Sequence, residues 1–389
     1  MAMELETFTE MFGDKNALDF KKLKYKFGEK NLVEYLETLK ENFYQELPLP
    51  DFKGKPLVLL PAKISLTTQL TKALAASYLG EKYGLQAMED EIIATLSIEQ
   101  IDSSRESVRR ILQGGAPVTS NENKAYGIKR GLDFIADTAN KITEENLYRL
   151  YKLAVGDFLE DEDRLKTDHK YRHDVVYVVG QNIEHQGLTY QLLPKYMSTL
   201  IDYLHQEDSL DQIVKSIVLH YYFAYLHPYF DGNGRMSRLL QLWYLAQKGY
   251  TASLFIPFST YINGGKGLYY KAFTSIADNF KVSQILDVTP FVTYFIDQVV
   301  TKLPQKNEPS QALDQFNNLL QTGVITAKER DLFHYVLSAY GICEFSTKQL
   351  EKDYKNAAYA TIRSFVLKLE SKGLLASQKY GNRIRYRLK

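Results

Sequence analysis

The chain has 389 residues, of which 48 are basic and 47 acidic, so its formal net charge at pH 7 is only +1. This balance excludes a surface built entirely for nucleic acid, and the length predicts two or three domains with sizeable cores. A single cysteine, Cys343, excludes an internal disulfide framework and suits a reducing compartment. We find no signal peptide and no membrane-spanning apolar run, so we expect a cytoplasmic protein without a membrane partner.

The first part of the chain is predicted to be mainly helical. Residues 31–43 have helical spacing and stop at Leu47-Pro48-Leu49-Pro50, which is a rigid extended segment. Thr143 is a suitable N-cap, with two glutamates in the turn that follows. Further helices are expected over 62–83, 89–112 with an interruption near 102–104, 124–139 and 143–154.

The apolar pattern changes period after residue 174. Residues 175–179 are rich in β-formers, Gly187 is a turn residue, and 188–192 alternate again. These features predict a β-hairpin, or flap, over 175–192, the clearest strand pair before residue 300. Helices resume over 193–205, 213–226, 236–247, 269–278 and 289–303.

The C-terminal part follows a linker-like stretch at 306–310. Four helices and two short basic strands, 375–379 and 383–388, predict a winged helix-turn-helix domain. Residues 361–389 hold four Arg and four Lys against one Glu, a local net charge of +7. DNA binding and protein docking both remain open for this domain. The candidate phosphate contacts are Arg363, Lys368, Lys372, Arg383, Arg385 and Arg387.

The most informative stretch is His-Pro-Tyr-Phe-Asp-Gly-Asn-Gly-Arg-Met-Ser-Arg at 227–238, between two apolar helices. A glycine-rich turn that opens a helix presents backbone N–H groups to phosphate, and guanidinium groups beside it add charge. His227 is the candidate general base, and Asp231 is the candidate oxygen ligand for Mg²⁺ shared with phosphate. Arg235 and Arg238 share one helix face, so both can reach a polyphosphate. The sequence therefore predicts a nucleotide site.

This stretch resembles the signature of the Fic family, His-x-Phe-x-Asp/Glu-Gly-Asn-Gly-Arg-x-x-Arg, with Tyr229 in place of phenylalanine and expected to keep its packing role. The resemblance implies a mainly α fold, a Fic-type helical bundle with a flap, over about residues 60–303. It also implies transfer of AMP from ATP to a hydroxyl of a target protein, with His227 as base and Mg²⁺ on Asp231. The residues implied to bind ATP are Gly232, Asn233, Gly234, Arg235, Met236, Ser237, Arg238, Asn263 and Tyr270.

A second resemblance lies upstream. Residues 95–100 read Thr-Leu-Ser-Ile-Glu-Gln and are similar to the family's inhibitory helix, Ser/Thr-x-x-x-Glu-Gly/Asn, apart from Gln100. The similarity implies that Glu99 pairs with Arg238, takes the place of the γ-phosphate and blocks productive ATP binding. The flap resembles the hairpin that docks the target segment through main-chain hydrogen bonds.

The sequence thus predicts four regions: an N-terminal helical region with the inhibitory helix (1–112), a catalytic core (113–303), a linker (304–324) and a winged helix (325–389). The preferred function is an autoinhibited protein adenylyltransferase that also modifies itself. Two alternatives stay open at the same site, removal of AMP and transfer of another phosphate-containing group. A third is a DNA-binding regulator whose Fic domain senses nucleotide. The target protein and the oligomeric state are not identified.

Overall fold

A computed structural model of the protein describes residues 3–66, 85–179, 183–250, 253–254, 256–305, 315–316, 318–320, 322–340, 344–354, 357–381 and 383–389. Most of the helix expected over 62–83 lies outside these residues, as do the stretch at 306–310, Cys343 and Asn382. The described chain is mainly helical, with three two-stranded antiparallel sheets, so the predicted mainly α class is confirmed.

The N-terminal segment forms a small unit with its own core. Helices α1 (Leu5–Gly13), α2 (Phe20–Phe27) and α3 (Glu29–Asn42) pack around Tyr35, which is fully buried. The extended segment expected around Pro48 is strand β1 (Gln45–Pro50), and it pairs with β2 (Pro56–Leu59). The pairing was not predicted from the sequence, because prolines donate no ladder bonds and obscure the alternation of two buried leucines, Leu47 and Leu49.

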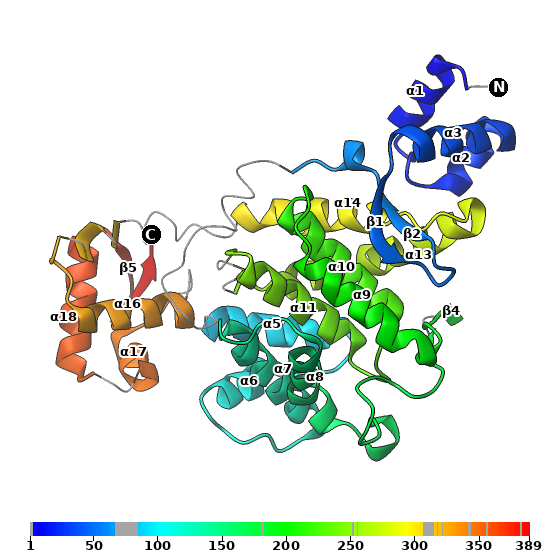
Figure 1. The fold of residues 1–389 in the computed structure, drawn as a ribbon. Helices are drawn as coiled ribbons and strands as arrows, with labels where there is room; N and C mark the ends of the chain where they lie inside the picture. Colours follow the sequence, from blue (N-terminus) through cyan, green and yellow to red (C-terminus); the bar gives the residue numbers. More distant parts are fainter. Residues whose placement is uncertain are drawn as a thin grey trace.

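Two antiparallel helices, α10 (Gln212–Leu226) and α11 (Asn233–Gln247), run through the main hydrophobic core and are buried on nearly every side (Figure 1). Leu96, Ile98 and Val108 lie in this same core, so the stretch expected as the inhibitory helix packs on the main helical bundle. The surrounding helices are α5 (Leu85–Ile98), α6 (Arg105–Leu112), α7 (Ser120–Ala136), α8 (Glu144–Ala154), α9 (Leu193–His205), α12 (Phe258–Gly264), α13 (Lys266–Ser283) and α14 (Thr289–Gln298). Short 3₁₀ turns cover Pro61–Lys63, Gly156–Phe158, Asp161–Asp163, Tyr190–Leu192 and Val300–Gln305.

The predicted flap is a hairpin, but its second strand was placed too late. Strand β3 (Tyr177–Val179) pairs with β4 (Ile183–Gln186), and the expected strand over 188–192 is a buried leucine followed by a 3₁₀ turn. Gly187 ends the hairpin, with its N–H bonded to the Val176 carbonyl at 3.1 Å. The alternation after residue 187 reflects the burial of Leu188, which returns the chain to the core.

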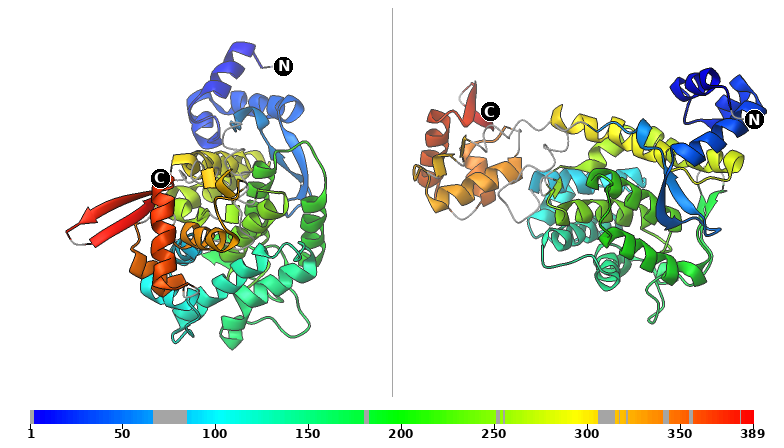
Figure 2. Two further views of the ribbon diagram at one scale, coloured as in Figure 1. Left: turned by 90° about the vertical axis from the view of Figure 1, so that its left-hand side faces the viewer. Right: turned by 45° about the horizontal axis from the view of Figure 1, so that its top comes forward.

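The C-terminal unit has a separate core, built from helices α16 (Ala327–Tyr340), α17 (Thr347–Tyr354) and α18 (Tyr359–Ser371). Strands β5 (Leu375–Tyr380) and β6 (Arg383–Leu388) form a hairpin that projects from these helices (Figure 2). Helix α16 packs against α5, which connects this unit to the main bundle (Figure 1). The elements follow the order expected for a winged helix, and that interpretation stays a prediction.

Candidate functional site

The candidate site is the loop between α10 and α11. His227 ends α10 in the left-handed conformation, with φ 53°, and its N–H still donates to the Phe223 carbonyl at 3.1 Å. A non-glycine residue in this conformation is strained, and such strain concentrates at functional sites. Gly232 begins α11 at φ 81°, and a Cβ there would lie 2.6 Å from Val155, so only glycine fits.

The first turn of α11 presents three N–H groups that have no intrahelical acceptor, those of Asn233, Gly234 and Arg235. They are the candidate anion cradle, and the side chain of Asn233 is not part of it. That side chain closes the loop instead, because it accepts from the Tyr229 N–H at 2.9 Å and donates to the Tyr229 carbonyl at 2.8 Å. Tyr229 is fully buried and stacks on Tyr151, so its expected packing role is confirmed.

Two of the expected ATP-binding residues face away from the cradle. Met236 is fully buried in the core, and its N–H donates to the Gly232 carbonyl at 2.9 Å, which leaves it no group to offer a phosphate. Ser237 is also buried, with its hydroxyl bonded to the Gly234 carbonyl at 2.8 Å. The family motif runs continuously through both positions, and the helical turn rotates their side chains into the core.

Both arginines of the motif are buried and paired to one carboxylate. Glu99 Oε1 lies 2.6 Å from the Arg238 guanidinium, and Glu99 Oε2 lies 2.8 Å from Arg235 Nε. Arg238 also donates to the Thr95 hydroxyl at 2.6 Å. A Cβ at Gly234 would lie 2.7 Å from Glu99 Oε1, so the carboxylate sits directly against the cradle. Thr95 and Glu99, the two matched positions of the upstream pattern, thus both contact Arg238.

The end of α5 presents Glu99. The Gln100 N–H bonds to the Ser97 carbonyl at 3.1 Å, and the Ile101 N–H bonds to the Leu96 carbonyl at 3.0 Å. This pair of bonds is a Schellman motif, which needs a left-handed residue after the cap, and Gln100 has φ 60°. The backbone therefore explains why glycine or asparagine suits this position of the pattern. In this chain a glutamine occupies it at a steric cost.

Asp231 lies at the edge of the cradle, with its side chain 43% exposed and its Oδ2 2.6 Å from the Arg235 guanidinium. Its other oxygen accepts the Gly232 N–H at 2.6 Å. Mg²⁺ shared with a polyphosphate needs only one or two protein carboxylates. An exposed carboxylate beside an anion cradle fits that requirement, so Asp231 is the residue that would hold the ion.

The residues expected to close the adenosine pocket contact the end of α5. The Ser97 hydroxyl donates to the Asn263 side-chain oxygen at 3.4 Å, and the Tyr270 hydroxyl donates to the Ile98 carbonyl at 3.1 Å. Lys266 adds a contact that the sequence analysis did not assign, from its ammonium group to the Ser97 carbonyl at 3.0 Å. A cation at a helix C-terminus is stabilising. The paired residues lie about 170 positions apart in the chain, so the sequence alone could not indicate these contacts.

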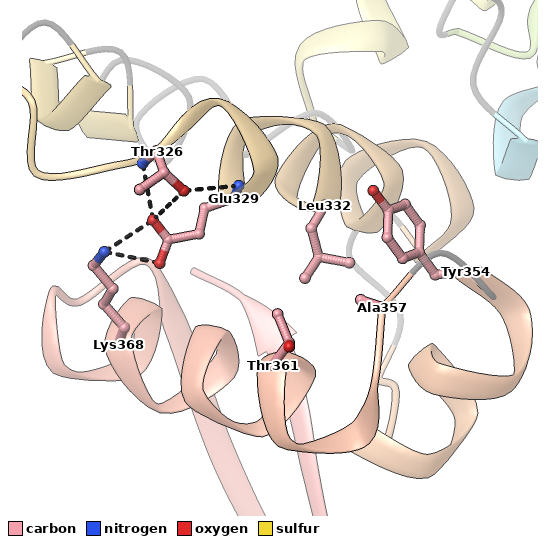
Figure 3. Close-up of a pocket in the computed structure, with 7 residues that line it drawn as sticks. All are labelled: Thr326, Glu329, Leu332, Tyr354, Ala357, Thr361 and Lys368. Atoms are coloured by element: carbon pink, nitrogen blue, oxygen red, sulfur yellow. Dashed lines mark hydrogen bonds and ion pairs between the residues drawn. The ribbon is translucent and has the colours of Figure 1, made fainter.

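The basic residues of the C-terminal unit fall into two groups. Arg383, Arg385 and Arg387 are exposed on the hairpin, and no ion pair to them is found among the described residues. Lys368, in contrast, points between α16 and α18 and pairs with Glu329 at 2.8 Å (Figure 3). Lys368 thus has a partly buried glutamate on the neighbouring helix as its counter-ion, and its expected role as a phosphate contact stays a prediction.

The comparisons with known proteins match the part of the chain that contains the candidate site. Residues 141–245 match the Fic/DOC family model. The chain is 26% identical over 173 residues to a probable protein adenylyltransferase aq_aa38 of Aquifex aeolicus, covering 41% of this chain and 48% of that protein. It is 24% identical over 249 residues to protein adenylyltransferase fic-1 of Caenorhabditis briggsae, covering 60% and 42%. The chain thus spans about half the length of the curated relatives it matches.

A crystal structure of a Fic family protein from Desulfovibrio desulfuricans aligns with 84% of this chain and 98% of its own, at 19% identity and a TM-score of 0.49. Fold and candidate site together describe a mainly helical protein whose central helix pair is joined by a glycine-rich loop beside two buried arginines. Residues 141–245, which include the motif at 227–238, are the part of the chain that is similar to a Fic domain. No helix in the described part of the chain is long and apolar enough to cross a membrane.

Proposed function

We propose that the protein transfers AMP from ATP to a hydroxyl side chain of a target protein, and to itself. The observation that carries the proposal is the convergence of the α11 N-terminus and two buried arginines on one carboxylate, beside the loop that His227 begins. Two guanidinium groups with a helix N-terminus form a site for a polyphosphate. The curated relatives, which carry the name protein adenylyltransferase, support the same reaction class.

In the proposed reaction the target hydroxyl gives its proton to His227 and its oxygen bonds to the α-phosphorus. The bond from that phosphorus to the bridging oxygen breaks, and diphosphate leaves. The N–H groups of the cradle stabilise the charge that develops on the phosphate oxygens, while Arg235 and Arg238 bind the β- and γ-phosphates. Mg²⁺ on Asp231 would neutralise phosphate charge. The flap, β3 and β4, would dock the target segment by strand addition.

Glu99 is proposed to inhibit the enzyme. Its carboxylate is bound to both arginines and lies against Gly234, which is where the terminal phosphate of ATP would bind. Because two like charges cannot share these guanidinium groups, ATP binds productively only when Glu99 leaves. The same carboxylate could instead orient water for removal of AMP, which is the alternative reaction at this site.

Incubation with ATP labelled at the α- or the γ-phosphate tests the reaction. Glu99→Gly protein should gain label from α-labelled ATP only, and Glu99→Gly/His227→Ala protein should gain none. Label from the γ-position would indicate transfer of a phosphate group instead. Loss of a preloaded AMP group from wild-type protein, without incorporation in either variant, would favour removal of AMP.

A second candidate function is binding of duplex DNA by the C-terminal hairpin, with the Fic domain acting as a nucleotide sensor. Arg383, Arg385 and Arg387 alternate along β6, so they share one face of the projecting hairpin. DNA retention that falls as salt rises, and that is lost when the three are changed to alanine, would support it. Retention unchanged by the triple substitution would leave this face as a protein-docking or plain solvated surface.

A further inference from the structure

Arg172 is a buried cation that neither the motif nor the reaction above uses. It lies just before β3, and only 2% of its surface is exposed. Its guanidinium donates to the His227 carbonyl at 2.7 Å, to the Asp174 carbonyl at 2.7 Å and to the Leu188 carbonyl. Its own backbone N–H donates to the Pro228 carbonyl at 2.9 Å. Arg172 therefore joins the loop after α10 to both ends of the flap.

The chemistry of this contact requires arginine. A planar guanidinium carries five donors in a fixed fork, whereas a lysine ammonium is a single point that cannot span carbonyls from three separate segments. Burial lowers the pKa of Arg172 to about 10, with the Asp174 charge acting in the opposite sense, so the group stays charged at neutral pH. A buried cation is costly unless its donors are satisfied, which makes the positions of the three carbonyls interdependent.

The partners of Arg172 belong to the two parts of the candidate site, the flap and His227, whose relative position matters for the proposed reaction. His227 has a strained left-handed backbone, and Arg172 binds the carbonyl of that residue. Asp174 precedes β3 and Leu188 follows β4, so the guanidinium closes the base of the hairpin. Gly187 leaves space for it, because a Cβ there would lie 2.8 Å from the Arg172 guanidinium.

We propose that Arg172 is a positioning residue that couples the flap to His227, so that a segment paired with the hairpin presents its hydroxyl to the imidazole. The inference rests on the proposed function and adds to it a residue outside the motif. Arg172 touches neither ATP nor the acceptor. It would act on the position of the acceptor hydroxyl relative to ATP, and group transfer is sensitive to displacements of about 1 Å in that position.

The test uses the full chain with Glu99→Gly as the parent. Arg172→Lys and Arg172→Gln should lower the maximal rate of self-labelling from α-labelled ATP on the order of 100-fold, with the half-saturating ATP concentration unchanged. Arg164→Gln is the matched control, since Arg164 lies in the same segment, is exposed and pairs with Asp161. It should match the parent. Full labelling rates in the Arg172 variants, or a parallel loss of ATP affinity, would overturn the proposal.

Two further measurements guard against simple misfolding and against failure of the proposed function. Gly187→Ala keeps Arg172 but crowds its guanidinium, and it should reproduce the loss of rate with unchanged ATP affinity. Hydrogen exchange needs no activity: Arg172→Gln should raise exchange together in peptides covering 174–188 and 226–230. A rise in one peptide alone would refute the coupling, even if the parent incorporates no AMP, whereas a concerted rise in an inactive parent would discard only the AMP-transfer step.

Discussion

The start of α11 and the C-terminal hairpin both carry closely spaced arginines, which are buried and paired in the first region and exposed in the second. Arg235 and Arg238 are 1% and 4% exposed and share the carboxylate of Glu99. Arg383, Arg385 and Arg387 are exposed on a projecting hairpin and have no carboxylate partner among the described residues. Spacing along the sequence indicates that arginines share a face. It does not indicate whether that face is a sealed site or an open surface.

The difference determines what each region can bind. A buried arginine needs a counter-charge, so in the proposed function a polyphosphate binds only by displacing Glu99, and that exchange of one anion for another would act as a switch. An exposed arginine pays little for being unpaired and attracts any polyanion in a salt-dependent manner. The first region is therefore suited to a regulated small-molecule site and the second to a weakly selective surface.

The largest difference in the free energy of unfolding is expected between two single variants, in each of which an arginine of one region is replaced by methionine. Arg238→Met should lower the free energy of unfolding by about 2–3 kcal/mol, because Thr95 and one oxygen of Glu99 lose a buried partner. Arg385→Met should change it by less than about 0.5 kcal/mol. Urea unfolding can be followed by fluorescence of Trp243, the single tryptophan, which is fully buried in α11. Equal effects would mean that pairing does not distinguish the two regions.

A smaller difference in the free energy of unfolding is expected between removal of a hydrogen-bonded hydroxyl and removal of an unpaired one near the α10–α11 loop. The buried Tyr171 hydroxyl donates to Glu144 at 2.7 Å, while the Tyr229 hydroxyl is buried without a hydrogen-bond partner among the described residues. Tyr171→Phe should cost about 1 kcal/mol, and Tyr229→Phe should be neutral or stabilising. The comparison uses the same urea unfolding assay. A loss of more than about 1 kcal/mol for Tyr229→Phe would indicate a partner for its hydroxyl.

The smallest effect concerns the strained end of α5. Gln100→Gly should stabilise the protein by about 0.5–1 kcal/mol, because glycine adopts φ 60° without a Cβ clash. Gln113 also ends a helix, but at φ −84°, so Gln113→Gly should give no gain. Thermal melting of both variants measures the difference. A destabilised Gln100→Gly protein would mean that the glutamine side chain contributes more than its backbone strain removes.

Much of the fold could be predicted from the sequence, and so could the position of the candidate site. Helices α3, α8 and α9 follow the expected ranges closely, and the Thr143 hydroxyl accepts from the Asn146 N–H as a cap should. The α10–α11 turn also lies where the glycines predicted it. These features depend on local chemistry, namely apolar spacing, capping and the need for positive φ.

The features that sequence reasoning missed depend on distant partners. Residues 188–192 alternate like a strand, but Leu188 turns into the core and its carbonyl binds Arg172. Met236 lies inside the motif, yet the helical rotation buries it. Lys368 was predicted as a phosphate contact, and nothing in the sequence indicated its pairing with Glu329, 39 residues earlier. In each case the surroundings of the side chain in the folded protein, which the local pattern does not encode, decide what it contacts.

The central claim is that Glu99 holds the arginines of the cradle in place of ATP. The most direct test is the initial rate of AMP incorporation from α-labelled ATP in wild-type and Glu99→Gly protein, with Glu89→Gln as a control on the same helix whose carboxylate pairs instead with Arg105 and Arg109. Glu99→Gly should exceed wild type at least about tenfold, equivalent to ~1.4 kcal/mol, and Glu89→Gln should not. Equal rates in wild-type and Glu99→Gly protein would contradict the claim.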